Sequence, residues 1–492
     1  MKKYRSLGVN ALLNAFKSGL SVLFPLITYP YALRVLQPEG IGKVNYASSI
    51  VSYFALVASL GISTYAVREG AKLRDDRSKI ETFAKQIFTI NVTTTIISYI
   101  ALFFCLVFVN EFRNYALLIL ISSISIAMGT LGLEWMNTIY EDYLFITIRS
   151  IVTHLVTLCV LFIFVKGPED CAKYALLSVL TTTIICISNM FYCRRYISIG
   201  LTRNVELAKH IKPILIMFAN MVATSIYVNA DVTMLGWMCG DYYTGLYTLA
   251  TKVYGVAKKM MVSLYSVAIP RISLYAGNHD FENLKKIYTS LMSSITIVLI
   301  PASAGLIVLS KEVVQFMGGE EYGNSVLTLQ LLSVALVGAI FGGAVTYVLN
   351  IPLGREKNNV IATIFSAVIN IGLNVFFIKE FQQNGAAITT AISEFFVFFF
   401  CLFKTKDIKE YLDIRKWLSN VVQAGIGVIW IVFVSVVARL LITNTLLLFF
   451  GIIAVSVLGY AVVLMALHND VAFLYLGKIL KKKLGNKGKR EE

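Results

Sequence analysis

Long apolar stretches recur along the whole chain, and charged residues gather in the short segments between them. A helix of about 20 apolar residues is long enough to cross the hydrocarbon core of a bilayer. The pattern therefore predicts an all-α, polytopic membrane protein with about 14 transmembrane helices. We place these helices near residues 7–33, 43–66, 86–109, 115–137, 145–165, 172–192, 213–237, 243–268, 288–309, 325–349, 359–378, 385–403, 417–437 and 445–467.

Composition agrees with this pattern. Hydrophobic residues make up 57% of the chain, charged residues only 15%, and the mean hydropathy is +0.73. Soluble domains are about 45–50% apolar. The segments between the apolar stretches are too short to fold as domains, and they contain no phosphate-binding loop, metal-ligand motif or nucleophile elbow. We therefore expect a protein that is not an enzyme and needs no cofactor.

The basic residues alternate along the chain. Of the 44 Lys and Arg, 32 fall in every second connecting segment or at the two termini, and only eight fall in the segments between those. Lys and Arg are enriched in the cytoplasmic loops of membrane proteins. The alternation predicts that both termini are cytoplasmic, and it explains the net charge of +16 without a nucleic-acid partner.

Two halves of the chain resemble each other weakly. EFRNYALLILISS at 111–123 is similar to EYGNSVLTLQLLS at 321–333, and polar positions with the same 4, 3, 4 spacing recur in the first and seventh spans. These positions are Asn10, Asn14, Lys17 and Ser21, and then Asn220, Thr224, Tyr227 and Asp231. Parallel repeats of this kind often enclose a transport site. We therefore divide the chain into an N-lobe (1–205), a C-lobe (206–405), two additional helices (406–470) and a basic tail (471–492).

Lys17 and Lys252 lie deep inside predicted spans. A lysine at the bilayer centre costs about 3 kcal/mol even on mild scales, so buried charges usually face an interior cavity. Each lysine either lines such a cavity or pairs with an acid, Asp231 or Glu394, in another span. Those two acids are in turn either sites for a coupling ion or counter-ions of the lysines.

Other charged residues have two readings as well. Lys258 and Lys259 either line the cavity or extend to the inner headgroups, and Arg34 either caps the cavity or anchors the outer end of the first span. Pro25 and Pro30 should bend that first span, because proline removes a helical hydrogen bond.

Several segments, taken together in their order and spacing, resemble the Wzx-type polysaccharide flippases. These belong to the polysaccharide-transporter branch of the MOP superfamily, whose relatives are the MATE exporters and the MurJ lipid II flippases. The segments are YPYALRVLQPEGIGKVNYASS at 29–49, GISTYAVREGAKLRDD at 61–76, GLEWMNTIYEDYLFITIRS at 132–150, DVTMLGWMCGDYYTGLYTLATKVYG at 231–255 and GAAITTAISE at 385–394. One departure is LQPEG at 36–40, where the family usually has LGPEG, so that Gln37 replaces a glycine.

This resemblance implies a MATE-like fold of two six-helix lobes around a central cavity, with two additional C-terminal helices. It implies translocation of undecaprenyl-pyrophosphate-linked oligosaccharide units from the cytoplasmic to the periplasmic leaflet of the bacterial inner membrane. Such units serve the assembly of O-antigen of lipopolysaccharide, capsule or exopolysaccharide. It also implies alternating access coupled to an ion gradient, and a polysaccharide polymerase and a chain-length regulator as partners besides the lipid-linked substrate and membrane lipids.

The resemblance and the buried charges together suggest a cationic cavity, because the substrate headgroup is a pyrophosphate. The expected substrate-binding residues are Lys17, Lys252, Lys259, Arg34, Arg149, Asn14 and Tyr227. The expected ion-coupling residues or counter-ions are Asp231, Glu394 and Glu134.

Three other functions compete with this one. A MurJ-like lipid II flippase would share the fold and the anionic substrate. A MATE-like exporter of cationic drugs would need a net acidic cavity, which the lysines disfavour. A polysaccharide polymerase or ligase would need a large outer loop with catalytic residues, whereas the longest outer loop here is about 310–324.

Overall fold

The computed structural model describes residues 7–405 and 407–473, apart from the side chains of 7–18, 20–23, 143, 220, 223–224, 226–228 and 446. Within these residues the secondary structure is helical throughout, as the apolar pattern predicts. The chain forms two compact units. The first contains the described residues up to Thr248 together with Met317–Tyr322 and Asn374–Gln383, and the second contains the remainder.

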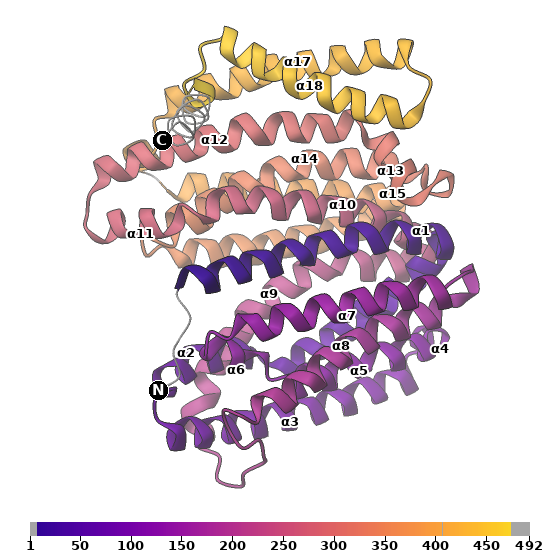
Figure 1. Cartoon of the computed structure of the whole chain (residues 1–492), viewed down its shortest axis with the longest axis vertical. Coiled ribbons are helices and arrows are strands. Elements are labelled where there is room, and N and C mark those ends of the chain that lie inside the picture. The colour runs from indigo at the N-terminus through magenta and orange to yellow at the C-terminus, as the bar shows by residue number, and fades with distance from the viewer. Residues whose placement is uncertain (1–6, 406, 474–492) are drawn as a thin grey trace, which may run out of the picture. The chain divides into compact units, whose positions relative to one another are not determined.

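The first unit is built mainly from the N-terminal half of the chain. Figure 1 shows its helices α3, α5, α7 and α8 side by side, and α1 packs against α3, α5, α7, α8 and α9. Its helices are α1 (Leu7–Ser59), α2 (Ile62–Leu73), α3 (Arg77–Phe108), α4 (Asn110–Asn114), α5 (Ala116–Leu131), α6 (Glu134–Ile139), α7 (Tyr143–Phe164), η1 (Pro168–Asp170), α8 (Cys171–Cys193), α9 (Leu207–Cys239) and η2 (Glu320–Tyr322).

The second unit is organised around α12, which packs against α14 and α17. Its helices are α11 (Ile269–Gly277), α12 (Phe281–Val308), α14 (Ser325–Gly343), the π-helical η3 (Ala344–Asn350), α16 (Ile408–Tyr411), α17 (Ile414–Leu441) and α18 (Thr445–Ala466). Residues from α10 (Asp241–Ser266), α13 (Ser310–Gly318) and α15 (Glu356–Lys404) belong to both units. The core of this unit contains Tyr288, Leu299 and Ile340, all fully buried.

Ten segments of the described chain are long and apolar enough to cross a membrane, so the protein is a multi-pass membrane protein. The predicted count of 14 helices is not confirmed. Two of the long helices, α1 and α15, each extend over two predicted spans. Helix α10 carries Lys252, Lys258 and Lys259 and is too charged to be recognised as a span by composition.

Pro25 and Pro30, where we expected a bend, both lie inside helical backbone and do not interrupt α1. The non-helical residue is Gln37, with φ 59° and ψ 177°. Proline disfavours the α-helical conformation of the residue before it, and Gln37 precedes Pro38. The interruption lies at this residue, in a backbone conformation that is almost restricted to glycine.

After this break, α1 meets the start of α10 at unusually short range. A Cβ atom added to Gly42 would lie 1.8 Å from the carbonyl oxygen of Asp241, and one added to Gly245 would lie 1.9 Å from that of Pro38. Two glycines thus allow the backbones of α1 and α10 to touch directly within the first unit.

Candidate functional site

Three groups of buried polar residues interrupt the apolar interior, two in the first unit and one in the second. Buried ionisable residues in membrane segments usually mark substrate or ion pathways. We call these groups the Arg149 centre, the Asp231 centre and the Glu394 centre, and each is described within its own unit.

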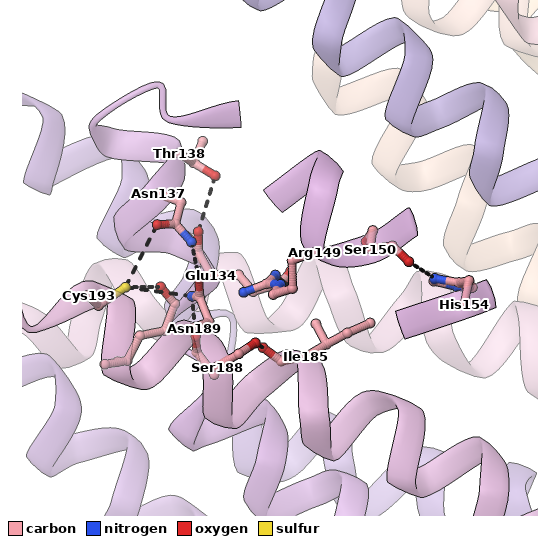
Figure 2. A network of polar contacts seen from close by, with 12 residues as sticks. Glu134, Asn137, Thr138, Arg149, Ser150, His154, Ile185, Ser188, Asn189 and Cys193 are labelled. Carbon is pink, nitrogen blue, oxygen red and sulfur yellow. Dashed lines mark hydrogen bonds and ion pairs between the residues drawn. The ribbon is translucent and has the colours of Figure 1, made fainter. Parts of the chain in front are cut away.

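The Arg149 centre lies where α6, α7 and α8 approach one another (Figure 2). Arg149 extends from α7 and is only 8% exposed. One guanidinium nitrogen, Nη2, lies 3.4 Å from Oε1 of Glu134, the first residue of α6. The guanidinium carbon lies 5.4 Å from the ring centre of Phe145, one turn earlier in α7.

The guanidinium of Arg149 is incompletely paired. Its Nε and Nη1 atoms are buried and have no hydrogen-bond partner among the described residues. The side chain of Glu134 is 55% exposed, and its 3.4 Å contact is long for a charge-assisted hydrogen bond. Arg149 thus has donors available for a second anion, and Glu134 is placed to be displaced by one.

A rigid amide network holds α6 against α8 beside Arg149 (Figure 2). Asn137 donates to the side-chain oxygen of Asn189, and Asn189 donates to the carbonyl oxygen of Gly132. Cys193 contacts the side-chain oxygen of Asn137 at 3.8 Å. Because Asn137 and Asn189 are fully buried, these contacts fix the start of α6 and therefore the position of Glu134.

The Asp231 centre joins α9, α10 and the first-unit part of α15. Asp231 is 5% exposed, and it accepts hydrogen bonds from the hydroxyl of Tyr247 at 2.6 Å and from the amide of Asn374 at 2.7 Å. Two uncharged donors thus hold the carboxyl group in place. The sequence predicted Asp231 but neither of these two partners.

The Glu394 centre joins α10 and α15 in the second unit. Glu394 is 7% exposed, and its Oε1 lies 2.5 Å from Nζ of Lys258 and 3.1 Å from the hydroxyl of Tyr254. Lys258 also lies 5.4 Å from the ring centre of Tyr254. The acid predicted as an ion site or counter-ion therefore has a lysine partner, and that lysine is Lys258.

The remaining predicted residues fall into two groups. Arg34, Lys252 and Lys259 have exposed side chains, and Arg34 lies in the first unit while both lysines lie in the second. Lys17, Asn14 and Tyr227 lie in helical backbone, but their side chains are outside the described part of the chain. Of the ten predicted residues, the structure brings Arg149 and Glu134 together.

Sequence reasoning named Lys258 but not as the partner of Glu394, and it missed Tyr254, Tyr247 and Asn374. The i, i+4 spacing of Tyr254 and Lys258, which places both on one helix face, was a usable signal. For Asn374 no local signal existed, since it is 143 residues from Asp231. The described residues contain no group of His, Cys, Asp or Glu that could hold a metal ion.

Comparison with solved structures defines the class of the fold. The chain is similar to the inward closed conformation of the lipid II flippase MurJ, with a TM-score of 0.74 and 15% identity, covering 94% of this chain and 99% of that one. It is also similar to a MATE transporter mutant, with a TM-score of 0.50 and 17% identity, over 81% of this chain and 96% of that one. The protein therefore has the MATE-like fold that the resemblance implied.

The sequence then identifies the family. Residues 7–276 match the model of the polysaccharide biosynthesis protein family, and the chain belongs to that family. A protein of Shigella dysenteriae named as an O-antigen transporter is 22% identical over 80% of this chain and 98% of its own length. These matches confirm the resemblance to Wzx-type flippases, and the relatives' names describe transporters, in agreement with a protein that is not an enzyme.

Proposed function

We propose that this protein translocates an undecaprenyl-pyrophosphate-linked oligosaccharide unit from the cytoplasmic to the periplasmic leaflet of a bacterial inner membrane. The product would serve assembly of a surface polysaccharide such as O-antigen, capsule or exopolysaccharide. The family and the name of the Shigella relative support this class of substrate. The distribution of Lys and Arg supports an orientation with both termini in the cytoplasm.

The observation that carries the proposal is the incompletely paired guanidinium of Arg149. A buried donor without a partner costs roughly 1–3 kcal/mol, and an arginine can bind two oxygens of a phosphate at once. A pyrophosphate headgroup supplies such oxygens. The headgroup would compete with Glu134 for Arg149, and the return of Glu134 would favour its release.

Alternating access couples this exchange to transport. The exposed cationic residues Arg34, Lys252 and Lys259, with Lys17, Asn14 and Tyr227, would line the route of the headgroup, while the lipid tail remains in the bilayer. Asp231 would bind the coupling ion, and Glu394 would act as the counter-ion of Lys258, its partner at 2.5 Å. A polysaccharide polymerase and a chain-length regulator would receive the product.

The test is surface-glycan export in cells that lack the chromosomal copy of this gene. Arg149→Gln should abolish export at a normal protein level, whereas Glu134→Gln, which removes only the acid that favours release, should slow export without abolishing it. Lys17→Ala and Lys252→Ala should each reduce export strongly. Full export by the Arg149 variant would refute the role of this centre, and full export by both lysine variants would refute the cationic route.

The same cells separate the competing functions. Restoration of growth in a strain depleted of its lipid II flippase, without glycan export, would assign the lipid II function. Resistance to cationic drugs without glycan export would assign a MATE-like function.

A further inference from the structure

A cleft of about 620 Å³ opens within the first unit and is separate from the three charged centres. It is lined by residues of α1, α2, α3, α5 and α9. Its polar lining residues are Ser52, Ser59, Ser63, Asn91, Ser125, Thr130, Ser225 and Asn229. Among the lining residues that the structure describes, every polar group is a hydroxyl or an amide, and none is ionisable.

Three of the hydroxyl protons in this cleft are already used. Ser52, Ser59 and Ser125 donate to carbonyl oxygens three residues earlier in their own helices, at 2.6, 3.0 and 2.6 Å. A hydroxyl has one proton to donate but two lone pairs that accept. Each of these serines therefore keeps its accepting capacity for a ligand.

One of the two amides has the same bias. The Nδ2 group of Asn229 donates to the backbone oxygen and the hydroxyl of Ser225, at 3.0 and 3.3 Å, so its carbonyl oxygen is left to accept. The side-chain oxygen of Asn91, a residue that is only 8% exposed, has no hydrogen-bond partner among the described residues. At Ser52, Ser59, Ser125 and Asn229 the cleft therefore offers acceptors whose own donors are already used.

This bias selects the chemistry of the ligand. An ionised pyrophosphate offers acceptors and negative charge, so it does not complement the cleft. A sugar offers many hydroxyl donors around a ring, and the cleft volume is within the usual range of 300–1,000 Å³ for small-ligand sites. A single metal cation would also find oxygen ligands here, but it would leave most of the cleft volume unoccupied.

We propose that this cleft binds sugar rings of the lipid-linked saccharide, through hydroxyl donors directed at the serine and asparagine oxygens, while the pyrophosphate binds elsewhere. The inference rests on the proposed function and refines it by separating saccharide recognition from headgroup recognition. It follows that uncharged residues of α1, α5 and α9 recognise the saccharide, and that the cationic residues do not.

Gly129 provides a direct way to fill the cleft. It lines the cleft in α5, and a Cβ atom added there meets no other atom within 4 Å. Gly129→Leu therefore adds an apolar side chain at the wall of the cleft, at a position where its Cβ atom has room. The matched control is Gly425→Leu in α17. Gly425 does not line the cleft, and a Cβ atom added there also meets nothing within 4 Å.

The experiment compares two lipids bound to the purified full-length protein in nanodiscs. The first probe is lipid-linked saccharide extracted from membranes of the source organism, and the second is undecaprenyl pyrophosphate without sugar. We expect the wild type to bind the first lipid at least about tenfold more tightly than the second. In Gly129→Leu, and in the combined Ser52→Ala, Ser59→Ala and Ser125→Ala variant, that preference should fall to about twofold or less, with unchanged binding of undecaprenyl pyrophosphate.

Each other result is informative. Gly425→Leu should keep the full preference for the saccharide. If Gly129→Leu loses affinity for both lipids, or keeps its affinity for both, the inference is overturned and the proposed function remains intact. Sodium binding is measured on the same nanodiscs. If Gly129→Leu loses sodium binding but keeps the saccharide preference, the cleft is a cation site and the inference is overturned. A wild type that binds neither lipid would refute the proposed function itself, and the inference with it.

Discussion

At the scale of single residues, Gln37 is held in a conformation that glycine adopts far more easily. Its φ of 59° with ψ of 177° lies in a region that is almost restricted to glycine and costs other residues about 1–3 kcal/mol. Glycine itself costs about 0.5–1 kcal/mol through the entropy of the unfolded chain. We predict that Gln37→Gly stabilises the protein by about 1 kcal/mol, measured as a higher midpoint of thermal unfolding in detergent.

The control for Gln37→Gly is Gln37→Ala, which removes the same side chain but keeps the unfavourable Cβ. Alanine should give no increase in the midpoint. An equal increase from both substitutions would mean that the side chain of Gln37, and not its backbone conformation, destabilises the protein.

The limits of sequence reasoning are clear at this scale. Position within an apolar stretch was enough to select Asp231 and Glu394 as buried polar residues, and the family resemblance added Arg149. Their exposed fractions are 5%, 7% and 8%. Lys258 and Lys259 had the same two interpretations from the sequence, which did not identify which of them contacts Glu394. Adjacent residues point 100° apart around a helix, so that choice depends on the helix rotation, which only tertiary packing sets.

At the scale of helices, the contact between α1 and α10 depends on two glycines. Gly245→Ala would place a Cβ atom 1.9 Å from the carbonyl oxygen of Pro38, so the two helices must separate. We predict a loss of at least about 2 kcal/mol in stability. The measurements are the yield of monodisperse protein by fluorescence-detected size-exclusion chromatography and its thermal midpoint.

The matched control for Gly245→Ala is Gly255→Ala, ten residues later in the same helix. A Cβ atom there meets nothing within 4 Å, and alanine favours a helix over glycine by about 1 kcal/mol. The two substitutions should therefore act in opposite directions. Equal effects on yield and midpoint would contradict the close contact.

A second link between elements ties the start of α15 to the segment after it. The Nη1 and Nη2 atoms of Arg355 donate to the carboxylate of Asp407, at 2.7 and 2.6 Å. The hydroxyl of Tyr411 donates to the same carboxylate at 2.9 Å. The hydrogen bonds from Arg355, followed by that from Tyr411, lower the pKa of Asp407 from 3.8 to about 2. This ion pair closes the connection outside the membrane-spanning part of α15.

The sign of the pH effect follows from the lowered pKa. Asp407 binds its proton more readily in the unfolded chain, so its contribution to stability is complete above about pH 4 and is lost as the pH falls towards 2. We predict that Asp407→Asn lowers the thermal midpoint at pH 7, and that the difference from wild type shrinks between about pH 4 and pH 2. A difference that stays constant over that range would show that the ion pair does not contribute through charge.

At the scale of the whole molecule, the apolar pattern predicted the fold class, because the spacing of charged segments records where helices leave the bilayer. The count of spans was less certain for a physical reason. Helix α10 needs its lysines for contacts such as that with Glu394, and these lysines weaken the apolar signal on which the count depends. The acceptor-lined cleft was not predicted, since serine and asparagine in five helices converge only in three dimensions.

The two buried acids predict how an ion gradient would act on the whole transporter. Glu394 contacts the ammonium of Lys258, whereas the proposed function assigns the coupling ion to Asp231, whose carboxyl group accepts hydrogen bonds from a phenol and an amide. In proteoliposomes with an imposed proton or sodium gradient, we predict that Asp231→Asn loses most of the gradient-dependent acceleration of lipid translocation. Glu394→Gln should instead slow translocation equally with and without a gradient, and exchange of the pair, by Lys258→Glu with Glu394→Lys, should restore part of the rate. If Asp231→Asn keeps the gradient-dependent acceleration and Glu394→Gln loses it, coupling belongs to the second unit instead.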